Sequence, residues 1–351
     1  MYDDTKNARK IKSCDYNHEG KYPIIDQSSK NVIGYTDEID GLYNDVPVII
    51  FGDHTRRFKL VEEPFFIGAD GTKVLKLRSS VYDYKFIYYY LLHKKIPDTG
   101  YNRHFKWVKE LEFPEIPRSI QSDIVKKLEV LNDLISSKNK LLESFDILIK
   151  SRFVELFGDV VLNTLNWPLV KLSDIAEYRI GLTYKPDAIS SSGTAVLRSG
   201  NIQNSQLCYE DIIYVNSKVE PKLLLKNHDI LMCARNGSQS LVGKVALIEN
   251  DISNTTYGAF MIAISSKYYV YLFEYFRSQA FRRLISVGST TTINQVTTRM
   301  LNSIVIPLPD LETINRFALY HSQINKLKSD VQKSIEETQL LMDSLMQEYF
   351  G

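Results

Sequence analysis

The sequence is poor in the residues and segments that would place it outside a reducing compartment or in a membrane. Its 351 residues include only three cysteines, Cys14, Cys208 and Cys233, which form no Cys-x-x-Cys pair. An odd number of cysteines in so long a chain argues against a disulfide framework and fits a reducing cytoplasm. No apolar run approaches the roughly 20 residues of a membrane-spanning helix, and no charged start leads into an apolar segment. We therefore expect a soluble, cytoplasmic protein.

An excess of charge of either sign is also missing, since 43 lysines and arginines nearly cancel 42 aspartates and glutamates. The net charge of +1 gives the protein as a whole no attraction to a polyanion, so any nucleic-acid surface must be local. The hydrophobic content of 44% supplies material for the cores of two domains in a chain of this length.

Motifs for common chemistry are absent as well. The nearest approach to a phosphate-binding loop, Gly237 to Val245, has five residues between its glycines where four are required, and Val245 stands where a hydroxyl must bind magnesium. There is no GxSxG, HExxH or EF-hand motif, and the histidines show no ligand spacing, so we assign no catalytic residue and no metal site. The Pro-Pro pair typical of adenine methyltransferases is absent too, so we do not expect this chain to carry that chemistry.

The most informative feature that is present is an internal repeat. Glu155-Leu-Phe-Gly158 and Glu348-Tyr-Phe-Gly351 are similar, and 351 minus 158 is 193. The prolines of Phe113-Pro-Glu-Ile116 and Ile306-Pro-Leu-Pro309 lie at the same offset, since 307 minus 114 is also 193. A period of this length indicates a duplicated unit of domain size.

Two stretches without proline or glycine, residues 118 to 157 and 311 to 350, predict helices of about forty residues. Each would be roughly 60 Å long at about 1.5 Å per residue, longer than a globular domain requires. Apolar residues recur in both at spacings of four and three, as in the heptad seam of a coiled coil. The predicted interface of this helix pair consists of Ile124, Leu128, Leu131, Ile135, Leu142, Phe145, Ile149 and Leu156 in the first helix and Phe317, Ile324, Val331, Ile335, Met342 and Leu345 in the second.

Polar residues interrupt the seam at Lys138 and Arg152 and again at His321, Lys328 and Thr338. Two unrelated amphipathic helices, each packed on its own domain, are the alternative interpretation. The shared offset and register favour the duplicated unit, since 317 minus 124 is again 193.

The fold class that we expect is mixed α/β, with two β-rich domains separated by the two long helices. The expected domain 1 is residues 1–115 and the first spacer helix is 116–158, followed by domain 2 at 159–309 and the second spacer helix at 310–351. This arrangement is an internal two-fold pseudo-repeat, and its helices are expected to pair as an antiparallel coiled coil.

Within the domains, short apolar runs that stop at turn-forming residues predict strands. Val46 to Phe51 with Phe65 to Ile67, and Asp229 to Ala234 with Val245 to Ile248, are expected to form antiparallel meanders. Helical segments are expected at two further places, Tyr84 to Leu92 and Tyr268 to Leu284.

Polar and basic residues follow several of these predicted elements, in loops. Their chemistry suits DNA, because arginine can pair with both acceptors of guanine, asparagine can pair with adenine, and hydroxyls or cations can bind phosphate. Most such residues on any protein surface are merely solvated, so each is only a candidate. The candidates are His54, Arg56, Arg57, Arg103, His104 and Lys106 in the first half, and Arg198, Asn201, Arg235, Asn236, Lys244, Thr291 and Asn294 in the second.

The order and repetition of these motifs resemble the specificity subunits of type I restriction-modification systems over nearly the whole chain. Trp167-Pro-Leu-Val-Lys-Leu172 is similar to the opening of a recognition domain in that family, and Ile306-Pro-Leu-Pro309 is similar to its exit. The two Glu-x-Phe-Gly segments look like the family's helix ends, and Gly100 to Phe105 resembles the segment before the exit. Each motif is moderately specific, and their repetition makes the resemblance strong.

The resemblance implies a non-catalytic subunit that reads a bipartite DNA target, with one half-site for each recognition domain and a gap set by helix length. The implied partners are double-stranded DNA, modification subunits that methylate adenine N6, and a restriction subunit that holds the motor and the nuclease. The resemblance places S-adenosylmethionine, ATP and magnesium on those partners and no cofactor on this chain.

One departure concerns the start of the chain, because residues 1 to 22 contain nothing like the opening at Trp167. Offsets of 193 and 173 pair Met1 with Thr194 or with Asp174, so domain 1 is expected to be shortened by roughly 15 to 35 residues at its amino terminus. A partial or silent specificity protein, competent only in its second half, is therefore an alternative. An enzyme with its own nuclease or methyltransferase activity and a coiled-coil scaffold without DNA contacts also stay open.

Overall fold

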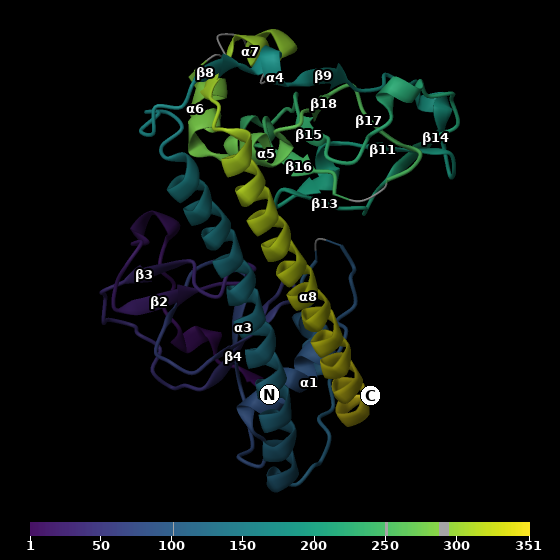
Figure 1. Cartoon of the computed structure of the whole chain (residues 1–351). Helices are drawn as coiled ribbons and strands as arrows, with labels where there is room; N and C mark the ends of the chain where they lie inside the picture. Colours follow the sequence, from purple (N-terminus) through teal and green to yellow (C-terminus); the bar gives the residue numbers. More distant parts are fainter. Residues whose placement is uncertain (101, 250–251, 288–294) are drawn as a thin grey trace. The chain divides into compact units, whose positions relative to one another are not determined.

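The computed structural model describes residues 1–100, 102–249, 252–287 and 295–351, which divide into two compact units (Figure 1). Unit 1 contains Met1–Lys140 and Val331–Gly351, and unit 2 contains Leu141–Asp330. The two predicted forty-residue helices are confirmed as α3 (Arg118–Phe157) and α8 (Leu311–Phe350), and so is the mixed α/β class. Both helices contribute buried residues to the core of each unit, so the compact units do not coincide with the linear segments expected from the sequence.

Unit 1 contains two small sheets and two short helices besides its parts of α3 and α8. The first sheet is antiparallel, in the order β1 (Tyr2–Asp3), β7 (Thr72–Lys76), β4 (Val48–Gly52) and β5 (Phe58–Val61). The second has the order β3 (Gly34–Thr36), β2 (Tyr22–Ile25) and β6 (Phe66–Ile67), and β2 and β6 are parallel. The helices are α1 (Tyr84–His93) and α2 (Phe105–Lys109), with 3-10 turns at Thr5–Asn7 and Ser13–Asp15.

Unit 2 contains two four-stranded sheets. One has the order β16 (Val245–Leu247), β15 (Ile230–Cys233), β18 (Met261–Ser265) and β9 (Glu177–Ile180), all antiparallel. The other has the order β10 (Ile189–Ser190), β14 (Ile213–Val215), β11 (Thr194–Leu197) and β17 (Thr255–Tyr257), in which β11 and β17 are parallel.

Smaller elements complete unit 2. Two pairs of strands lie outside the large sheets: β12 (Ile202–Gln203) with β13 (Gln206–Leu207), and β8 (Leu169–Lys171) with β19 (Val305–Pro307). The short helices are α4 (Leu172–Ile175), α5 (Tyr269–Arg277), α6 (Gln279–Val287) and α7 (Thr298–Ser303), and 3-10 turns occur at Pro186–Ala188, Ser199–Asn201, Pro221–Leu223 and Gln239–Leu241. None of the helices in the described part of the chain has an apolar stretch long enough to cross a membrane.

The two units have the same strand order. The sheet β1-β7-β4-β5 corresponds to β9-β18-β15-β16, and the parallel pair β2–β6 corresponds to β11–β17. Equivalent backbone hydrogen bonds align the chains residue by residue. The paired bonds are Asp53 N to Gly71 O with Ala234 N to Phe260 O, His104 N to Asp53 O with Val296 N to Ala234 O, and Gly68 N to Ile25 O with Gly258 N to Leu197 O. The sequence repeat is therefore a repeat of the fold.

The long helices pack together within each unit. Every predicted seam residue is buried or half-buried, and adjoining side chains that the heptad pattern missed, such as Phe153, Phe157, Met346 and Phe350, are buried too. They were missed because they also pack on the short helices, as Phe157 does on Tyr271 of α5 with ring centroids 5.0 Å apart. A heptad pattern describes a helix with one partner, whereas these helices have two.

Two sequence-based expectations were wrong. Tyr268 to Leu284 is not one helix, because Ser278 has extended backbone angles and its Oγ accepts a hydrogen bond from Phe281 N, which makes it the N-cap of a second helix. Phe65 to Ile67 does not continue a meander from Val46 to Phe51, because β6 pairs in parallel with β2 in the other sheet. The antiparallel pairing of β15 with β16 is confirmed.

Candidate nucleic-acid interface

Several strand ends meet at one edge of unit 2. Strands β9 and β15 both run antiparallel to β18, so their carboxyl ends lie at the same edge, and β11 and β17 are parallel to each other. A parallel bridge between Leu182 and Gly258 joins the end of β9 to the end of β17. The loops after these four strands therefore form one border, which we call the unit 2 rim (residues 182–184, 198–201, 235–238 and 258–260).

The close approach of β9 to β17 depends on Gly181. A Cβ at this position would lie 2.2 Å from the carbonyl oxygen of Gly258 and 2.4 Å from that of Tyr257. Backbone atoms cannot yield as a flexible side chain does, so only glycine allows the two strand ends to meet. The backbone of the sheet thus fixes where these strand ends meet.

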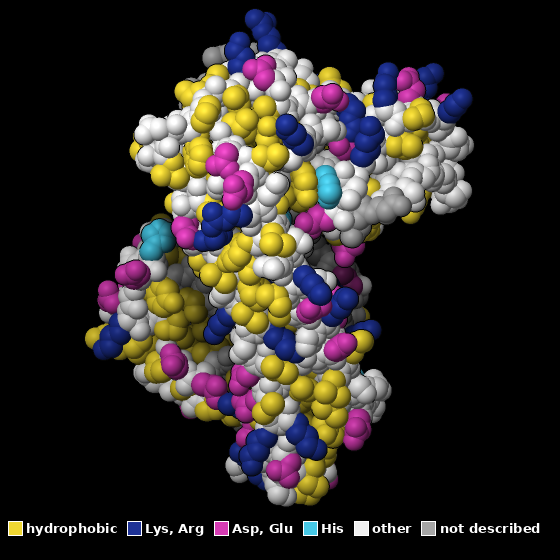
Figure 2. All heavy atoms as spheres, in the orientation of Figure 1, with side chains coloured by type: hydrophobic (Ala, Val, Ile, Leu, Met, Phe, Trp, Pro, Cys, Tyr) yellow, Lys and Arg dark blue, Asp and Glu magenta, His cyan; other side chains and the backbone are white. Residues whose placement is uncertain are grey.

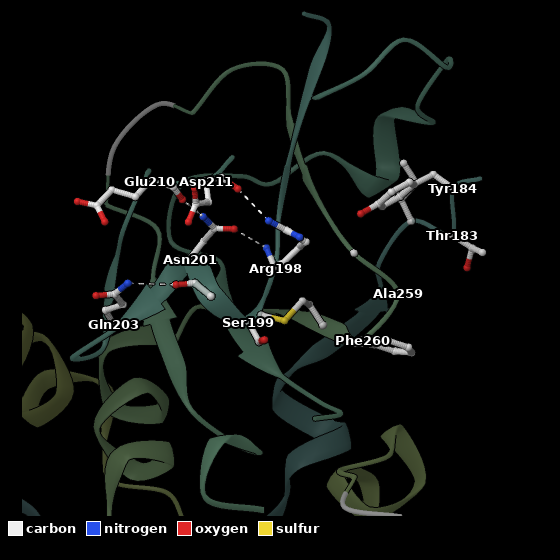
Figure 3. Close-up of a pocket in the computed structure, with 14 residues that line it drawn as sticks. Thr183, Tyr184, Arg198, Ser199, Asn201, Gln203, Glu210, Asp211, Ala259 and Phe260 are labelled. Atoms are coloured by element: carbon white, nitrogen blue, oxygen red, sulfur yellow. Dashed lines mark hydrogen bonds between the residues drawn. The ribbon is translucent and has the colours of Figure 1, made fainter. Parts of the chain in front are cut away.

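A cavity of about 770 Å³ opens at the unit 2 rim (Figure 3). Figure 3 shows the guanidinium of Arg198 near its centre, with Tyr184 and Phe260 on one side and Glu210 and Asp211 on the other. The wall therefore combines a cation, two aromatic rings and two carboxylates. The guanidinium and the carboxylates are the kind of donors and acceptors that read the edges of nucleic-acid bases, and the aromatic rings can hold such groups in place.

Arg198 and Asn201 are part of the structure of this wall. Arg198 Nη2 donates to the carbonyl oxygen of Asp211 at 2.9 Å, and its buried Nε has no hydrogen-bond partner in the described part of the chain. The buried side chain of Asn201 accepts from Arg198 N at 2.9 Å and donates to the carbonyls of Cys208 and Glu210. Asn201 therefore holds the loop in shape and presents no edge to a base.

Arg235, in contrast, is exposed and pre-positioned. Its guanidinium carbon lies 5.5 Å from the ring centroid of Phe260, a side chain that is itself 60% exposed. The backbone N–H groups of Ala234 and Arg235 both donate to the carbonyl of Phe260, at 2.9 and 3.1 Å, which fixes the two residues side by side. Next to Arg235, Asn236 donates from Nδ2 to Ser199 Oγ at 3.0 Å and so ties two loops of the rim together.

Lys244 lies deeper than its candidate role requires. Its Nζ donates to the carbonyl of Ile202 at 2.8 Å, and burial lowers the pKa of this amine. It therefore secures the β12–β13 hairpin to the sheet. The remaining candidates of the second half, Thr291 and Asn294, lie outside the described residues.

The corresponding edge of unit 1 is the unit 1 rim (residues 26–28, 53–57, 68–71 and 103–104). Gln27, after β2, links its loops: its Oε1 accepts from His54 N at 3.2 Å and its Nε2 donates to the carbonyl of Asp70 at 2.7 Å. His54 is half-buried beside Gly71, and Arg56 forms an ion pair with Asp98 at 2.7 Å. Arg56 also has a positive φ of 58°, as the tight turn between β4 and β5 demands.

The other candidates of unit 1 separate into exposed and buried side chains. Arg57, Arg103 and Lys106 are exposed, and Lys106 Nζ lies 4.9 Å from the ring centroid of Trp107. The side chain of His104 is completely buried, with Nδ1 3.0 Å from the carbonyl oxygen of Asp53 and Nε2 3.4 Å from Thr99 Oγ1. It has no surface with which to contact DNA, so it is a structural residue of the rim.

Sequence reasoning missed two side chains of the unit 2 rim, Phe260 and Tyr184. An aromatic residue beside a strand is usually core, and only the pairing of strands shows that Phe260 stands just before β18 at an open edge. In the described residues no group of three or more His, Cys, Asp or Glu side chains is arranged to hold a metal ion.

Comparisons with known proteins agree with this architecture. Residues 165–340 match the family described as the type I restriction modification DNA specificity domain. The type I restriction enzyme MjaVIII specificity subunit of Methanocaldococcus jannaschii is 22% identical over 317 residues, which cover 80% of this chain and 74% of that protein. The StySPI specificity subunit of Salmonella potsdam is 25% identical over 154 residues, 41% of this chain and 33% of that protein.

Solved structures show the same fold. The crystal structure of the S subunit of the type I restriction-modification system from M. genitalium aligns with a TM-score of 0.58 and 17% identity. The alignment covers 97% of this chain and 91% of that one.

Proposed function

The chain belongs to the DNA specificity subunits of type I restriction-modification systems, and from this premise we propose that each unit reads one half-site of a bipartite double-stranded target. The observation that supports this is the duplication of the rim. The two units share one strand order and present polar loops at the same edge of the sheet, as expected of two copies of a DNA-recognition domain. Two half-sites separated by an unread gap follow from two such domains on one chain.

We further propose that the chain performs no chemistry of its own. It would direct modification subunits that transfer a methyl group from S-adenosylmethionine to adenine N6, and a restriction subunit that uses ATP and magnesium. Those cofactors belong to the partner chains in this proposal. The mixed wall of the unit 2 rim supports a reading role, since it offers hydrogen-bond donors and acceptors to base edges.

Exposed apolar side chains on the long helices support recruitment of partner subunits (Figure 2). Three pairs of them recur at the repeat offset of 193 residues. They are Leu134 with Leu327, Ile147 with Leu340, and Leu148 with Leu341, all at least 42% exposed. Apolar side chains repeated on a helix surface are typical of a protein-binding face, and their duplication fits two copies of one partner.

The decisive experiment is methylome sequencing of a host that expresses this chain with the modification subunit of its own system. We expect N6-methyladenine in a single bipartite motif whose two parts are separated by unread bases. Methylation at a contiguous motif, or a stable complex that methylates nothing, would contradict two working recognition domains. A motif with one specified half would restrict reading to one unit.

Partner docking has its own test. We expect Leu340→Glu with Leu341→Glu to remove one of two modification subunits from the complex seen by native mass spectrometry, and Ile147→Glu with Leu148→Glu to remove the other. Ile39→Glu, at a side chain of unit 1 that is 70% exposed and lies outside the helices, is the matched control. An unchanged stoichiometry in both double variants would move the docking site away from this face.

A further inference from the structure

The equivalent backbone hydrogen bonds of the two units identify one position of special interest. Ala234 corresponds to Asp53. The backbone N–H of each donates to the carbonyl of the residue just before β18 or β7, and the backbone carbonyl of each accepts from Val296 N or His104 N. The next residues, Arg235 and His54, are therefore equivalent. Each lies two residues after the carboxyl end of an inner strand of its sheet, β15 or β4, and so belongs to the rim.

Arg235 is the side chain at this position that is best prepared to bind. Its guanidinium lies over the ring of Phe260, and in the described part of the chain no acceptor forms a hydrogen bond with it. Two other arginines of unit 2 donate to backbone carbonyls: Arg198 to that of Asp211 and Arg282 to that of Val242. A stacked guanidinium loses little freedom on binding and presents a flat fork of donors to a pair of acceptors.

Arg235 does not itself line the rim cavity, but its platform Phe260 does, and the charges of that cavity favour a base over a phosphate as the acceptor. Phe260 lines the same cavity as Glu210 and Asp211, both of which have exposed side chains. Two carboxylates repel a phosphate but accept hydrogen bonds from the amino groups of cytosine and adenine. Among base edges, the two acceptors that match an arginine fork are O6 and N7 of guanine.

We infer that Arg235 reads a guanine in the half-site recognised by unit 2, with Phe260 as the platform that orients it. The inference rests on the proposed function and deepens it by naming the base and the reader. Unit 1 differs at this position, because the residue equivalent to Phe260 is Gly71. A Cβ added to Gly71 would lie 2.8 Å from Cδ2 of His54, so no aromatic side chain fits beneath His54. The two half-sites therefore differ at the equivalent base.

The test uses the whole complex of this chain with its modification subunits and compares methylomes. With Arg235→Lys, which keeps the charge but loses the fork, we expect discrimination at one guanine of one half-site to fall roughly 10- to 100-fold. Arg235→His, which installs the residue of unit 1, is expected to do the same. The other half-site should be read unchanged and serves as an internal control, and Arg283→Lys on α6, an exposed arginine outside the rim, is the matched external control.

Phe260→Leu tests the platform. It is expected to weaken the same guanine preference to a smaller extent and to leave every other position of the motif intact. A weaker but unaltered motif in Arg235→His, which removes the charge at neutral pH, with binding whose salt dependence is reduced, would assign Arg235 to a phosphate and overturn the inference. A wild-type half-site without a G·C pair would overturn it as well. Failure of the proposed function looks different, since the wild-type chain would then direct no bipartite methylation at all.

Discussion

The two units place different side chains at equivalent points of the same backbone frame. Following the shared hydrogen bonds, Arg198 of unit 2 corresponds to Asp26 of unit 1, and Arg235 corresponds to His54. Asp26 lies 3.9 Å from the buried amine of Lys59, whereas Arg198 faces an open cavity. Strand pairing uses backbone atoms and tolerates few changes, while rim side chains carry no structural duty of that kind. One frame can thus serve two different half-sites.

The interiors of the two units differ in a similar way at equivalent places. The last phenylalanine of each long helix, Phe157 in unit 2 and Phe350 in unit 1, docks on a short helix of its unit. The start of β15 carries the buried Asp229, whereas the equivalent residue of β4 is the apolar Val48. Substitutions at such matched positions show whether equivalent residues of the two units contribute equally to the free energy of unfolding.

The largest effect is expected at the helix ends. Phe157 is 1% exposed and its ring contacts those of Phe153, Tyr271 and Phe317, with centroids 4.9 to 5.3 Å apart. Phe157→Ala should lower the free energy of unfolding of unit 2 by about 3–5 kcal/mol, because the cavity it leaves cannot collapse. Phe350→Ala should cost unit 1 less, since the rings around Phe350 lie farther from it, with centroids 5.4 to 6.5 Å from its own. Hydrogen exchange resolved by segment measures both, with Phe157→Leu as the conservative control, and equal losses would show that the anchors are interchangeable.

The next effect concerns the buried ion pair of unit 2. Asp229 is 2% exposed and its carboxylate accepts from Arg179, from Ser265 Oγ at 2.6 Å and from Lys226 N at 2.8 Å. Asp229→Asn leaves a partly buried guanidinium without its counter-charge, so we expect a loss of about 3 kcal/mol in chemical denaturation.

A double variant tests whether two apolar side chains can replace the ion pair of unit 2. Asp229→Val with Arg179→Met copies Val48 and removes both charges, and it should recover part of the loss seen in Asp229→Asn. If the double variant is less stable than Asp229→Asn, the pair stabilises the strand through its hydrogen bonds to Lys222 and Leu224 rather than through charge balance.

A smaller effect is expected at His104, whose equivalent in unit 2 is the buried Val296. His104→Val removes the contact between Nδ1 and the carbonyl of Asp53, which should cost about 1–2 kcal/mol and speed hydrogen exchange in residues 53–57. The reading of the unit 2 half-site should be unaffected. A variant of full stability that has lost the unit 1 half-site would instead reveal a direct role in recognition.

Much of the architecture was predictable because it depends on long, repeated patterns. The offset of 193 residues, the two helices and the seam follow from periodicity, which local sequence expresses directly. The break at Ser278 was not predicted, because its single hydroxyl cap interrupts an otherwise continuous helical pattern. The place of β6 was not predicted either, since a parallel partner from distant sequence leaves no local signal.

The rim was predictable in its location but only partly in its residues. Arginine and asparagine after strand ends lie in the loops that form the rims, yet Asn201 and His104 are buried while Arg235 is exposed. Composition cannot distinguish these cases, because a polar side chain that shapes a loop and one that reads a ligand occupy the same kind of sequence. Phe260 became visible only when strand pairing placed it beneath Arg235.

The smallest effect separates the two ends of the helix seam. In unit 2, Asp146 of α3 accepts from Lys328 of α8 at 3.0 Å and lies 3.5 Å from Arg277, whereas in unit 1 Lys138 donates to the neutral Ser334 and Thr338 hydroxyls at 2.8 Å. The carboxylate of Asp146 is 38% exposed, so screening reduces its value. Asp146→Asn should cost at most about 1 kcal/mol, and the loss should shrink at about 1 M salt. Lys138→Met should cost unit 1 an amount that salt leaves unchanged, because its partners are neutral. Unfolding at two salt concentrations measures both, and a salt-independent loss in Asp146→Asn would show that hydrogen-bond geometry, rather than charge, stabilises the seam of unit 2.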